Sequence, residues 1–412
     1  MKLYKLSAVM FSALLLASCS DIDNQEYAGG AISGEQSQET NSAIPSRTKA
    51  TFAGMFTLIG DPCHNYQTHF SDTRPDDFGF VMSAISLDLE GADMSMQDNG
   101  YNWFSASDEL SSRNANYANP YVRYVIPYTS LGIANDIINA FPADTNDAEA
   151  INMIAQAKTI RAFDYLSLAP YFQGSYQTSK DKPCVPLLDG KNDYTNNPRA
   201  TVAEVYTAII DDLSYAIDNL TDAREDKSRI NKSVALGLRA RAYLYMGEYA
   251  KALVDAEAAM KGYTPASLAD VSVPGFDDSS ASNWMWTYDL TDDQVASAAA
   301  SYATAASWMS AFCGQGYAVA TGNVPMINKL LYDKIPATDV RKGWWLDENL
   351  HSPLLANLEW KDSKGNVLAK GDAIAPLKIK DVKEPLVAYA NVKFGMKSGV
   401  GSSKNNNSWP LM

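Results

Sequence analysis

Aromatic side chains beside amides and carboxylates form the most distinctive chemical groupings in this sequence. One grouping is the polar run at 98–103, DNGYNW, in which Gly and Asn favour a turn. Another is the run at 283–289, NWMWTYD, where an extended chain would place its three ring-bearing residues on one side. Sugars stack their C–H faces on aromatic rings, and their hydroxyl groups bond to amides and carboxylates. The predicted ligand contacts are therefore Asn99, Tyr101, Trp103, Trp284, Trp286 and Trp308.

Each of these candidates has a second interpretation that the sequence leaves open. A strand buried in the core explains the alternation at 283–289 as well as a binding surface does. Trp308 lies in a segment with helical spacing, 297–312, where packing is the alternative. The loop at 98–103 is also suited to packing or to contact with another protein.

Residues for catalysis or metal binding are scarce. The chain has three histidines, and it contains no G-x-S-x-G, H-E-x-x-H or glycine-rich phosphate motif. Cys63, His64 and His69 are close in sequence, but no further cysteine or histidine lies nearby to complete a zinc site. We therefore expect a binding protein that is not an enzyme, with no metal and no cofactor.

The composition limits the partners. The chain has 412 residues, of which 46% are hydrophobic, so it can bury a large core. Its formal net charge is -14 and its pI is near 4.7, which disfavours binding to phosphate backbones. Nucleic acid is excluded as an expected partner.

The first residues indicate export and a lipid anchor. Lys2 and Lys5 precede an apolar run at 6–16 that is too short to span a membrane as a helix, which is typical of a signal peptide over 1–18. The sequence LASC at 16–19 looks like a lipobox, whose thiol, here Cys19, accepts diacylglycerol. With an acylated amine as well, three acyl chains such as palmitate would anchor the protein, at about 0.8 kcal/mol per buried methylene. The polar stretch 19–47 then serves as a flexible tether.

Apolar spacing predicts four helices in the middle of the chain, at 146–171, 201–220, 231–246 and 249–259. Pro170 is expected to stop the first helix and Gly247 to separate the last two. Thr201 and Glu204 form a capping box for the second helix. A short helix is also predicted at 324–335, and 172–199 is expected to be an irregular insertion.

Two of the predicted helices share a repeated pattern, R-A-x-x-Y-L, at 161–166 and 239–244. The pattern, followed by Gly247 and Tyr249, resembles the tetratricopeptide repeat, although generic alanine-rich packing is the alternative. Helical spacing weakens after 263. We therefore expect a mostly α fold, with tetratricopeptide-like helical repeats at 48–263 and a loop-rich, aromatic-rich region at 264–412 packed on them.

Several segments together resemble the SusD/RagB family of nutrient-binding outer-membrane lipoproteins. They are the segments 76–79, 88–94, 161–171, 185–187, 231–259, 331–332 and 339–341. The resemblance implies a surface-exposed lipoprotein that delivers an oligosaccharide to a SusC-like TonB-dependent transporter. A peptide-binding branch of the family and a tetratricopeptide-type adaptor for protein interactions are the alternatives. Family members continue into a further helix after the W-P-L-M segment found here at 409–412, so we expect a truncated chain with an exposed apolar helical face.

A Cys19→Ser substitution tests the predicted anchor. Without the thiol, no diacylglycerol can be attached, so the variant should leave the outer-membrane fraction while the wild-type protein stays in it. Fractionation and intact-mass measurement of the wild-type protein check this. An unmodified Cys19 would contradict the prediction.

Overall fold

The computed structural model describes residues 36, 39–40, 43–59, 79–96, 108, 110, 113–115, 118–191, 197–272, 275–289, 325–355, 359–361, 367–370, 387–394 and 408–412. Cys19, Asn99, Tyr101, Trp103 and Trp308, and the helix predicted at 297–312, lie outside these residues. No helix in the described part of the chain combines the length and hydropathy needed to cross a membrane.

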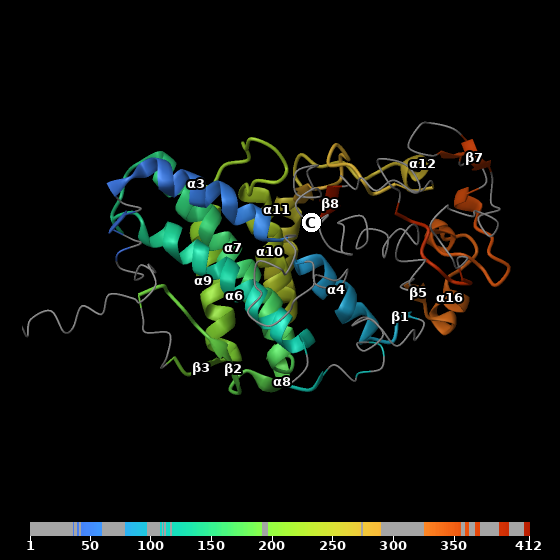
Figure 1. The fold of residues 1–412 in the computed structure, drawn as a ribbon, viewed down its shortest axis with the longest axis horizontal. Helices are drawn as coiled ribbons and strands as arrows, with labels where there is room; N and C mark the ends of the chain where they lie inside the picture. Colours follow the sequence, from blue (N-terminus) through green and yellow to red (C-terminus); the bar gives the residue numbers. More distant parts are fainter. Residues whose placement is uncertain are drawn as a thin grey trace, which may run out of the picture.

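Long helices packed one against the next form the larger part of the structure. Each helix contacts its neighbour in sequence, and Figure 1 shows this stack on the left of the molecule. The two helices that precede this stack in the chain, α3 and α4, both contact α6. The helices are α3 (Pro45–Met55), α4 (Gly79–Leu89), α6 (Ala118–Asn139), α7 (Ala148–Phe172), α9 (Val202–Asn219), α10 (Lys232–Met246) and α11 (Tyr249–Ala259), with the short η1 (Phe56–Ile59) after α3.

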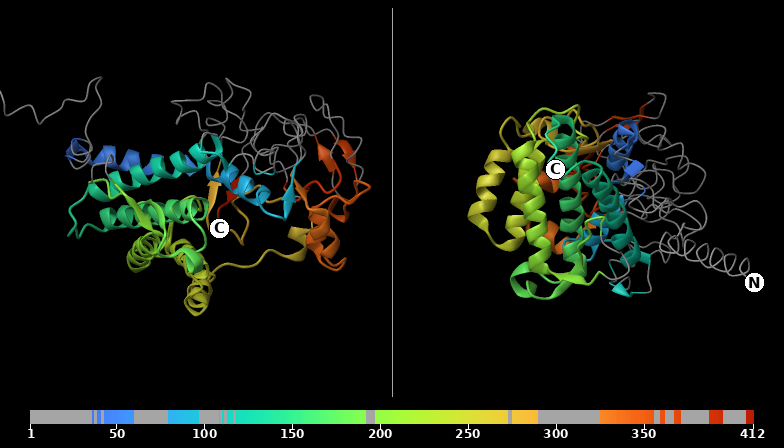
Figure 2. Two further views of the ribbon diagram at one scale, coloured as in Figure 1. Left: turned by 90° about the horizontal axis from the view of Figure 1, so that it is seen from below. Right: turned by 90° about the vertical axis from the view of Figure 1, so that its left-hand side faces the viewer.

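The described part of the second half of the chain is built from short elements, and its residues 325–355 lie at the other end of the molecule (Figure 1 and the left view of Figure 2). Its elements are α12 (Leu268–Val271), β4 (Thr287–Asp289), β5 (Met326–Ile327), α16 (Lys329–Lys334), η5 (Val340–Trp344), η6 (Pro353–Leu355), β6 (Glu359–Lys361), β7 (Val367–Lys370) and β8 (Ser408–Pro410). Antiparallel pairs join β4 to β8 and β6 to β7, and β5 pairs with β1 (Met94–Ser95) beyond the end of α4. The fold is mostly helical with few short strands, as the sequence predicts.

The predicted helix ends are confirmed for the repeated helices. The Thr201 hydroxyl accepts the Glu204 N–H, and the Glu204 carboxylate accepts the Thr201 N–H, which completes the capping box of α9. Asn231 caps α10 through its side chain. Gly247 ends α10 with a φ of 79°, a left-handed conformation that glycine adopts without steric cost.

Three local predictions are wrong. Pro170 does not stop α7, which continues to Phe172, because a proline in the last turn removes only one backbone donor. The segment 172–199 is not wholly irregular, since it contains α8 (Tyr176–Ser179) and the paired strands β2 (Pro183–Pro186) and β3 (Arg199–Thr201). The helix predicted at 324–335 begins as β5 and becomes helical at Lys329, because β1 pairs with its first residues.

The repeated R-A-x-x-Y-L pattern corresponds to a repeated ion pair. The guanidinium of Arg161 donates two hydrogen bonds to Asp212, 2.7 and 2.8 Å long, and a third to the Asn135 oxygen at 2.7 Å. This links α7 to both α9 and α6.

Arg239 makes the same arrangement one repeat later. It donates two bonds to Asp255, at 2.7 and 2.9 Å, and one to the Ser214 hydroxyl at 3.0 Å. These bonds link α10 to both α11 and α9. The internal repeat is therefore structural, because equivalent arginines connect equivalent sets of three helices.

The core between the helices and the loop-rich region is centred on Trp286, which is fully buried. Its ring packs edge-on against Phe163 of α7 with a centroid distance of 5.1 Å, and its indole N–H donates to the Ser228 carbonyl at 3.1 Å. The carbonyl oxygen of Met412 accepts the backbone N–H groups of Met285 and Trp286. Trp286, next to the β4–β8 pair, thus joins the loop-rich region to the helices.

The outer surface of α10 and α11 exposes large apolar side chains. They are Leu244, Tyr245, Tyr249, Leu253 and Val254, of which Tyr249 and Val254 are each 65% exposed. These two helices therefore carry exposed apolar side chains.

Replacing Arg161 by Met tests the repeated ion pair. Removing Arg161 leaves the nearly buried Asp212 with Lys158, 2.8 Å away, as its remaining counter-ion, so the free energy of unfolding should fall by about 1.5–3 kcal/mol. Urea denaturation measures this. Lys329→Met, which breaks an exposed pair with Asp333, is the matched control and should cost less than about 1 kcal/mol. Equal effects of both variants would contradict the structural role of Arg161.

Asp164 should make the protein less stable as the pH rises. Its carboxyl group is buried in α7 with the Ser130 hydroxyl as a hydrogen-bond donor, and burial raises its pKa well above the ordinary value of 3.8. Between that value and the native pKa, the unfolded chain loses a proton that the native state keeps, so stability falls with rising pH. Asp164→Asn should remove this fall in stability. The variant should therefore be more stable than the wild type near neutral pH, and this difference should vanish near pH 3. Denaturation curves from pH 3 to 8 check the difference.

Candidate functional site

Three cavities are candidates for a binding site among the described residues. The largest, about 630 Å³, lies where the end of α4 meets the start of α6 and the end of α7, and we call it the arginine cavity. The Trp284 pocket, about 210 Å³, lies between α12 and the chain at 276–284. The Tyr332 pocket, about 260 Å³, lies beside η5 and η6. They differ in the chemistry of their walls.

The Trp284 pocket combines aromatic rings with amide and carboxylate groups. Its lining residues are Ala266, Asp270, Val271, Phe276, Asp277, Asp278, Ser280, Ala281, Asn283 and Trp284. The indole N–H of Trp284 and the amide of Asn283 make no hydrogen bond to another described residue, which leaves both available to a ligand. Trp284 is only 3% exposed, so a sugar would contact mainly the Phe276 ring and the polar side chains of this wall.

Two of the pocket's carboxylates are already engaged. Asp270 accepts bonds from the backbone and hydroxyl of Ser267, and these bonds lower the pKa of its carboxyl group. Asp278 accepts the Ser280 N–H at 2.8 Å. Asp270 is therefore an ionised acceptor near neutral pH.

Phe276 is held in place by an aromatic cage around Lys393. The Lys393 ammonium lies 4.2, 4.5 and 5.1 Å from the ring centroids of Phe276, Trp344 and Phe394. Such contacts are attractive because the ring faces carry negative charge. Burial lowers the pKa of the Lys393 amine. Phe276 itself has a φ of 58°, a left-handed conformation that costs a bulky residue energy and that the surrounding packing must maintain.

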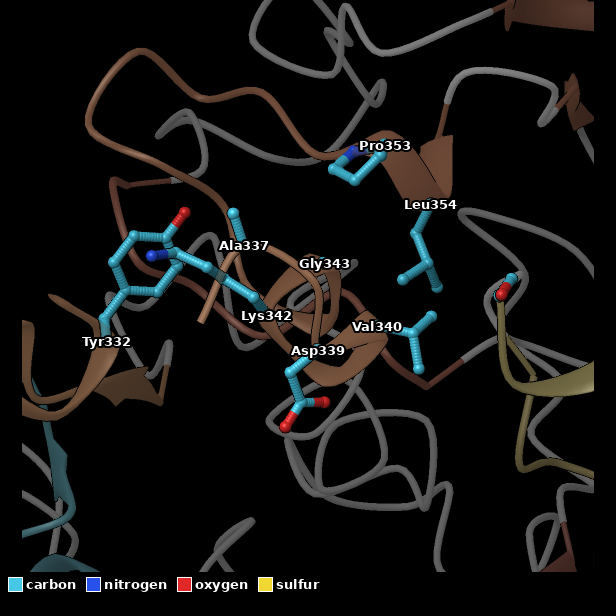
Figure 3. A pocket seen from close by; sticks show the side chains of 9 residues that line it. Tyr332, Ala337, Asp339, Val340, Lys342, Gly343, Pro353 and Leu354 are labelled. Atoms are coloured by element: carbon cyan, nitrogen blue, oxygen red, sulfur yellow. The ribbon is translucent and has the colours of Figure 1, made fainter. Parts of the chain in front are cut away.

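The Tyr332 pocket is less suited to a sugar because its charged side chains are already bound by other groups of the protein. Figure 3 shows Val340 and Leu354 pointing toward one another across it, with Tyr332 and Lys342 together on another side. The Lys342 ammonium lies 4.7 Å from the Tyr332 ring centroid and donates to the Ile335 carbonyl. Asp339 is bound by Arg341, which lowers the pKa of its carboxyl group to about 2.

The arginine cavity has a charged wall and an aromatic wall. Glu90 pairs with Arg123 at 2.5 Å and with Arg113 at 3.5 Å. The Arg123 guanidinium also lies 4.8 Å from the ring centroid of Tyr171, whose hydroxyl donates to the Ser83 carbonyl. Burial raises the pKa of Tyr171, so the hydroxyl stays protonated. Phe172 and Pro120 complete the wall.

The residues predicted from the sequence do not form one site in the described structure. Trp284 lines a pocket, and Asn283 beside it was not among the predicted contacts. Trp286 is fully buried with its N–H bonded inside the protein, so its ring is unavailable to a ligand and it is withdrawn as a candidate. Asn99, Tyr101, Trp103 and Trp308, which lie outside the described residues, remain predictions.

The residues of the arginine cavity were missed because they are scattered along the chain. Glu90, Arg113 and Arg123 come from different elements and no motif joins them. The one available signal was the helical spacing of Tyr121, Tyr124 and Tyr128 on α6. Tyr124 packs against Phe172 of the cavity wall, with a distance of 5.4 Å between ring centroids.

Known proteins with a similar sequence or fold are SusD-like. Residues 80–244 match the SusD-like family described as "Starch-binding associating with outer membrane". A SusD-like carbohydrate-binding protein of Bacteroides vulgatus shares the fold with a TM-score of 0.66 at 19% identity, over 89% of this chain and 68% of that one. The helical region at 80–244 is therefore SusD-like. A SusD superfamily protein of Bacteroides thetaiotaomicron gives a TM-score of 0.60 at 20% identity, over 88% of this chain and 72% of the other.

Two curated SusD-like proteins also match parts of this chain. One, from Bacteroides ovatus, is 30% identical over 123 residues, which cover 28% of this chain and 21% of the relative. The other, SusD-like protein P2 of Formosa agariphila, is 24% identical over 261 residues, or 62% and 46% of the two chains. The match thus spans less than half the length of either relative.

Proposed function

We propose that this SusD/RagB protein is a non-catalytic lipoprotein, anchored through Cys19 and facing the cell exterior, that binds an oligosaccharide and delivers it to a TonB-dependent outer-membrane transporter. The observation that carries the proposal is the Trp284 pocket, in which an indole and a free amide lie together on a SusD-like scaffold. A protein named as a laminarin-binding SusD-like protein has a similar fold, with a TM-score of 0.50 at 14% identity over 89% of this chain. That likeness supports a glycan ligand.

The size of the pocket suggests how a glycan would be held. At about 210 Å³ it is smaller than the usual range for sites that enclose a whole ligand, so it would hold one end of an oligosaccharide. The remaining sugar units would contact other residues, for which Asn99, Tyr101, Trp103 and Trp308 remain the candidates. Binding of this kind needs several weak contacts instead of one deep cavity.

The acidic groups of the pocket favour binding over hydrolysis. A glycosidase needs a carboxylic acid with a raised pKa beside a second carboxylate. The Asp270 carboxyl group has a lowered pKa instead, because Ser267 bonds to its ionised form. It can accept a bond from a sugar hydroxyl but is poorly suited to protonate a glycosidic oxygen.

A role in protein interaction is the second candidate function. The exposed apolar side chains of α10 and α11, among them Leu253 and Val254, favour it because large exposed apolar surfaces mark sites of association. A tetratricopeptide-type adaptor would bind protein segments without any preference for glycans.

Isothermal titration with laminarin and malto-oligosaccharides tests glycan binding. Asn283→Ala should weaken binding about tenfold, equivalent to ~1.4 kcal/mol, because it removes a hydroxyl partner without disturbing the core. Trp284→Ala should weaken it further, because the indole forms part of the pocket wall. The thermal midpoint of each variant must be compared with that of the wild type, because Trp284 is only 3% exposed.

Tyr332→Ala, in the separate Tyr332 pocket, is the matched control and should bind glycans as the wild type does. Unchanged affinity in both Trp284 pocket variants would refute this placement of the site. A wild-type protein that binds no glycan across a broad panel, but binds peptides, would refute the oligosaccharide ligand and support the peptide-binding branch of the family.

A further inference from the structure

The arginine cavity differs from the Trp284 pocket in carrying positively charged groups. Its wall presents the guanidinium groups of Arg113 and Arg123, and Glu90 is the one acidic residue among those that line it. Local cationic groups are notable in a chain whose formal net charge is -14. At about 630 Å³, the cavity falls within the usual volume range of small-molecule sites.

The two arginines are held very differently. Arg123 is nearly buried, with 7% of its side chain exposed, and it lies between the Glu90 carboxylate and the Tyr171 ring. Its position is therefore fixed by an ion pair on one side and by a ring face on the other.

Arg113 is held loosely. Its side chain is 59% exposed, and its one contact with a described residue is Glu90 at 3.5 Å, longer than a strong charge-assisted hydrogen bond. The Glu90 carboxylate is already engaged by Arg123 at 2.5 Å. The planar guanidinium of Arg113, which can bond to a carboxylate through two parallel N–H groups, therefore has most of its donors available.

We propose that the arginine cavity binds the carboxylate of an acidic sugar, so that oligosaccharides containing uronic acid are the preferred ligand class of this protein. The inference rests on the proposed glycan-binding function and adds the charge of the ligand. Arg113 receives the carboxylate, and the Glu90–Arg123 pair forms a rigid wall beside it. The rings of Tyr171 and Phe172 provide the apolar surface against which a sugar ring packs.

The net charge of the chain opposes the approach of an acidic oligosaccharide. A net charge of -14 repels an anionic oligosaccharide at long range, so attraction must come from direct contact inside the cavity. Arg113 is 59% exposed, so salt weakens this contact, but a direct contact is much shorter than the screening length of about 8 Å at 0.15 M. The preference for the acidic ligand should therefore survive at 0.15 M salt.

The test compares an acidic with a neutral oligosaccharide of the same length, tetragalacturonate and maltotetraose, by isothermal titration. The wild type should bind the acidic ligand at least tenfold more tightly. Arg113→Gln should remove this preference and leave neutral binding unchanged. Arg113→Lys should keep part of it, because lysine retains the charge but not the paired N–H geometry. Arg341→Gln, which removes another exposed arginine paired with a single carboxylate, is the matched control.

The outcomes separate this inference from the proposed function. If maltotetraose binds and tetragalacturonate is not preferred, or if Arg113→Gln keeps the preference, the inference is wrong and glycan binding stands. If neither oligosaccharide binds but free galacturonate or acetate does, and Arg113→Gln abolishes that binding, the cavity takes small carboxylates and the proposed glycan function is wrong. If none of these ligands binds, the inference is overturned.

Discussion

The paired arginine and aspartate side chains between the helices are the constraint on which the rest of the structure depends. Arg161 and Arg239 each bond to an aspartate on the following helix and to a polar group on the preceding one. A partly buried charge is costly unless it is paired, so only one relative placement of three helices satisfies each arginine. Hydrophobic contacts alone would allow the helices to slide, whereas these bonds fix their register.

The positions of both candidate sites follow from that register. The Asn135 side chain bonds to Arg161 and to the Leu188 carbonyl, and the Tyr165 hydroxyl accepts the Leu188 N–H, so the chain after β2 is fixed on the same helices. The ends of α6 and α7, aligned in this way, form the arginine cavity. On the other side of the stack, Phe163 of α7 packs on Trp286, two residues from the Trp284 pocket.

Local signals in the sequence predicted local structure well. The capping box at Thr201 and the stop at Gly247 depend on neighbouring residues, and the repeated R-A-x-x-Y-L pattern reports a repeated helix pair. Burial of Trp286 was not predictable, because alternation describes a buried strand and a binding surface equally. Likewise, β5 replaced a predicted helical turn because of pairing with β1, more than 200 residues earlier. The arginine cavity lacked any local pattern, since its charged residues meet only in three dimensions.

The pairing of β4 with β8 has a consequence for the order of folding. Helix pairs such as α10 and α11 close through contacts between neighbours in the chain, and such contacts form quickly. Trp286, by contrast, is covered by residues 408–412, and Gly237 of α10 lacks a side chain where one would collide with Met412. During synthesis, the helical stack can therefore assemble while one face of Trp286 is still exposed to solvent. The junction between the two halves of the molecule can therefore close only after residues 408–412 have been made, and it is exposed to misassembly before then.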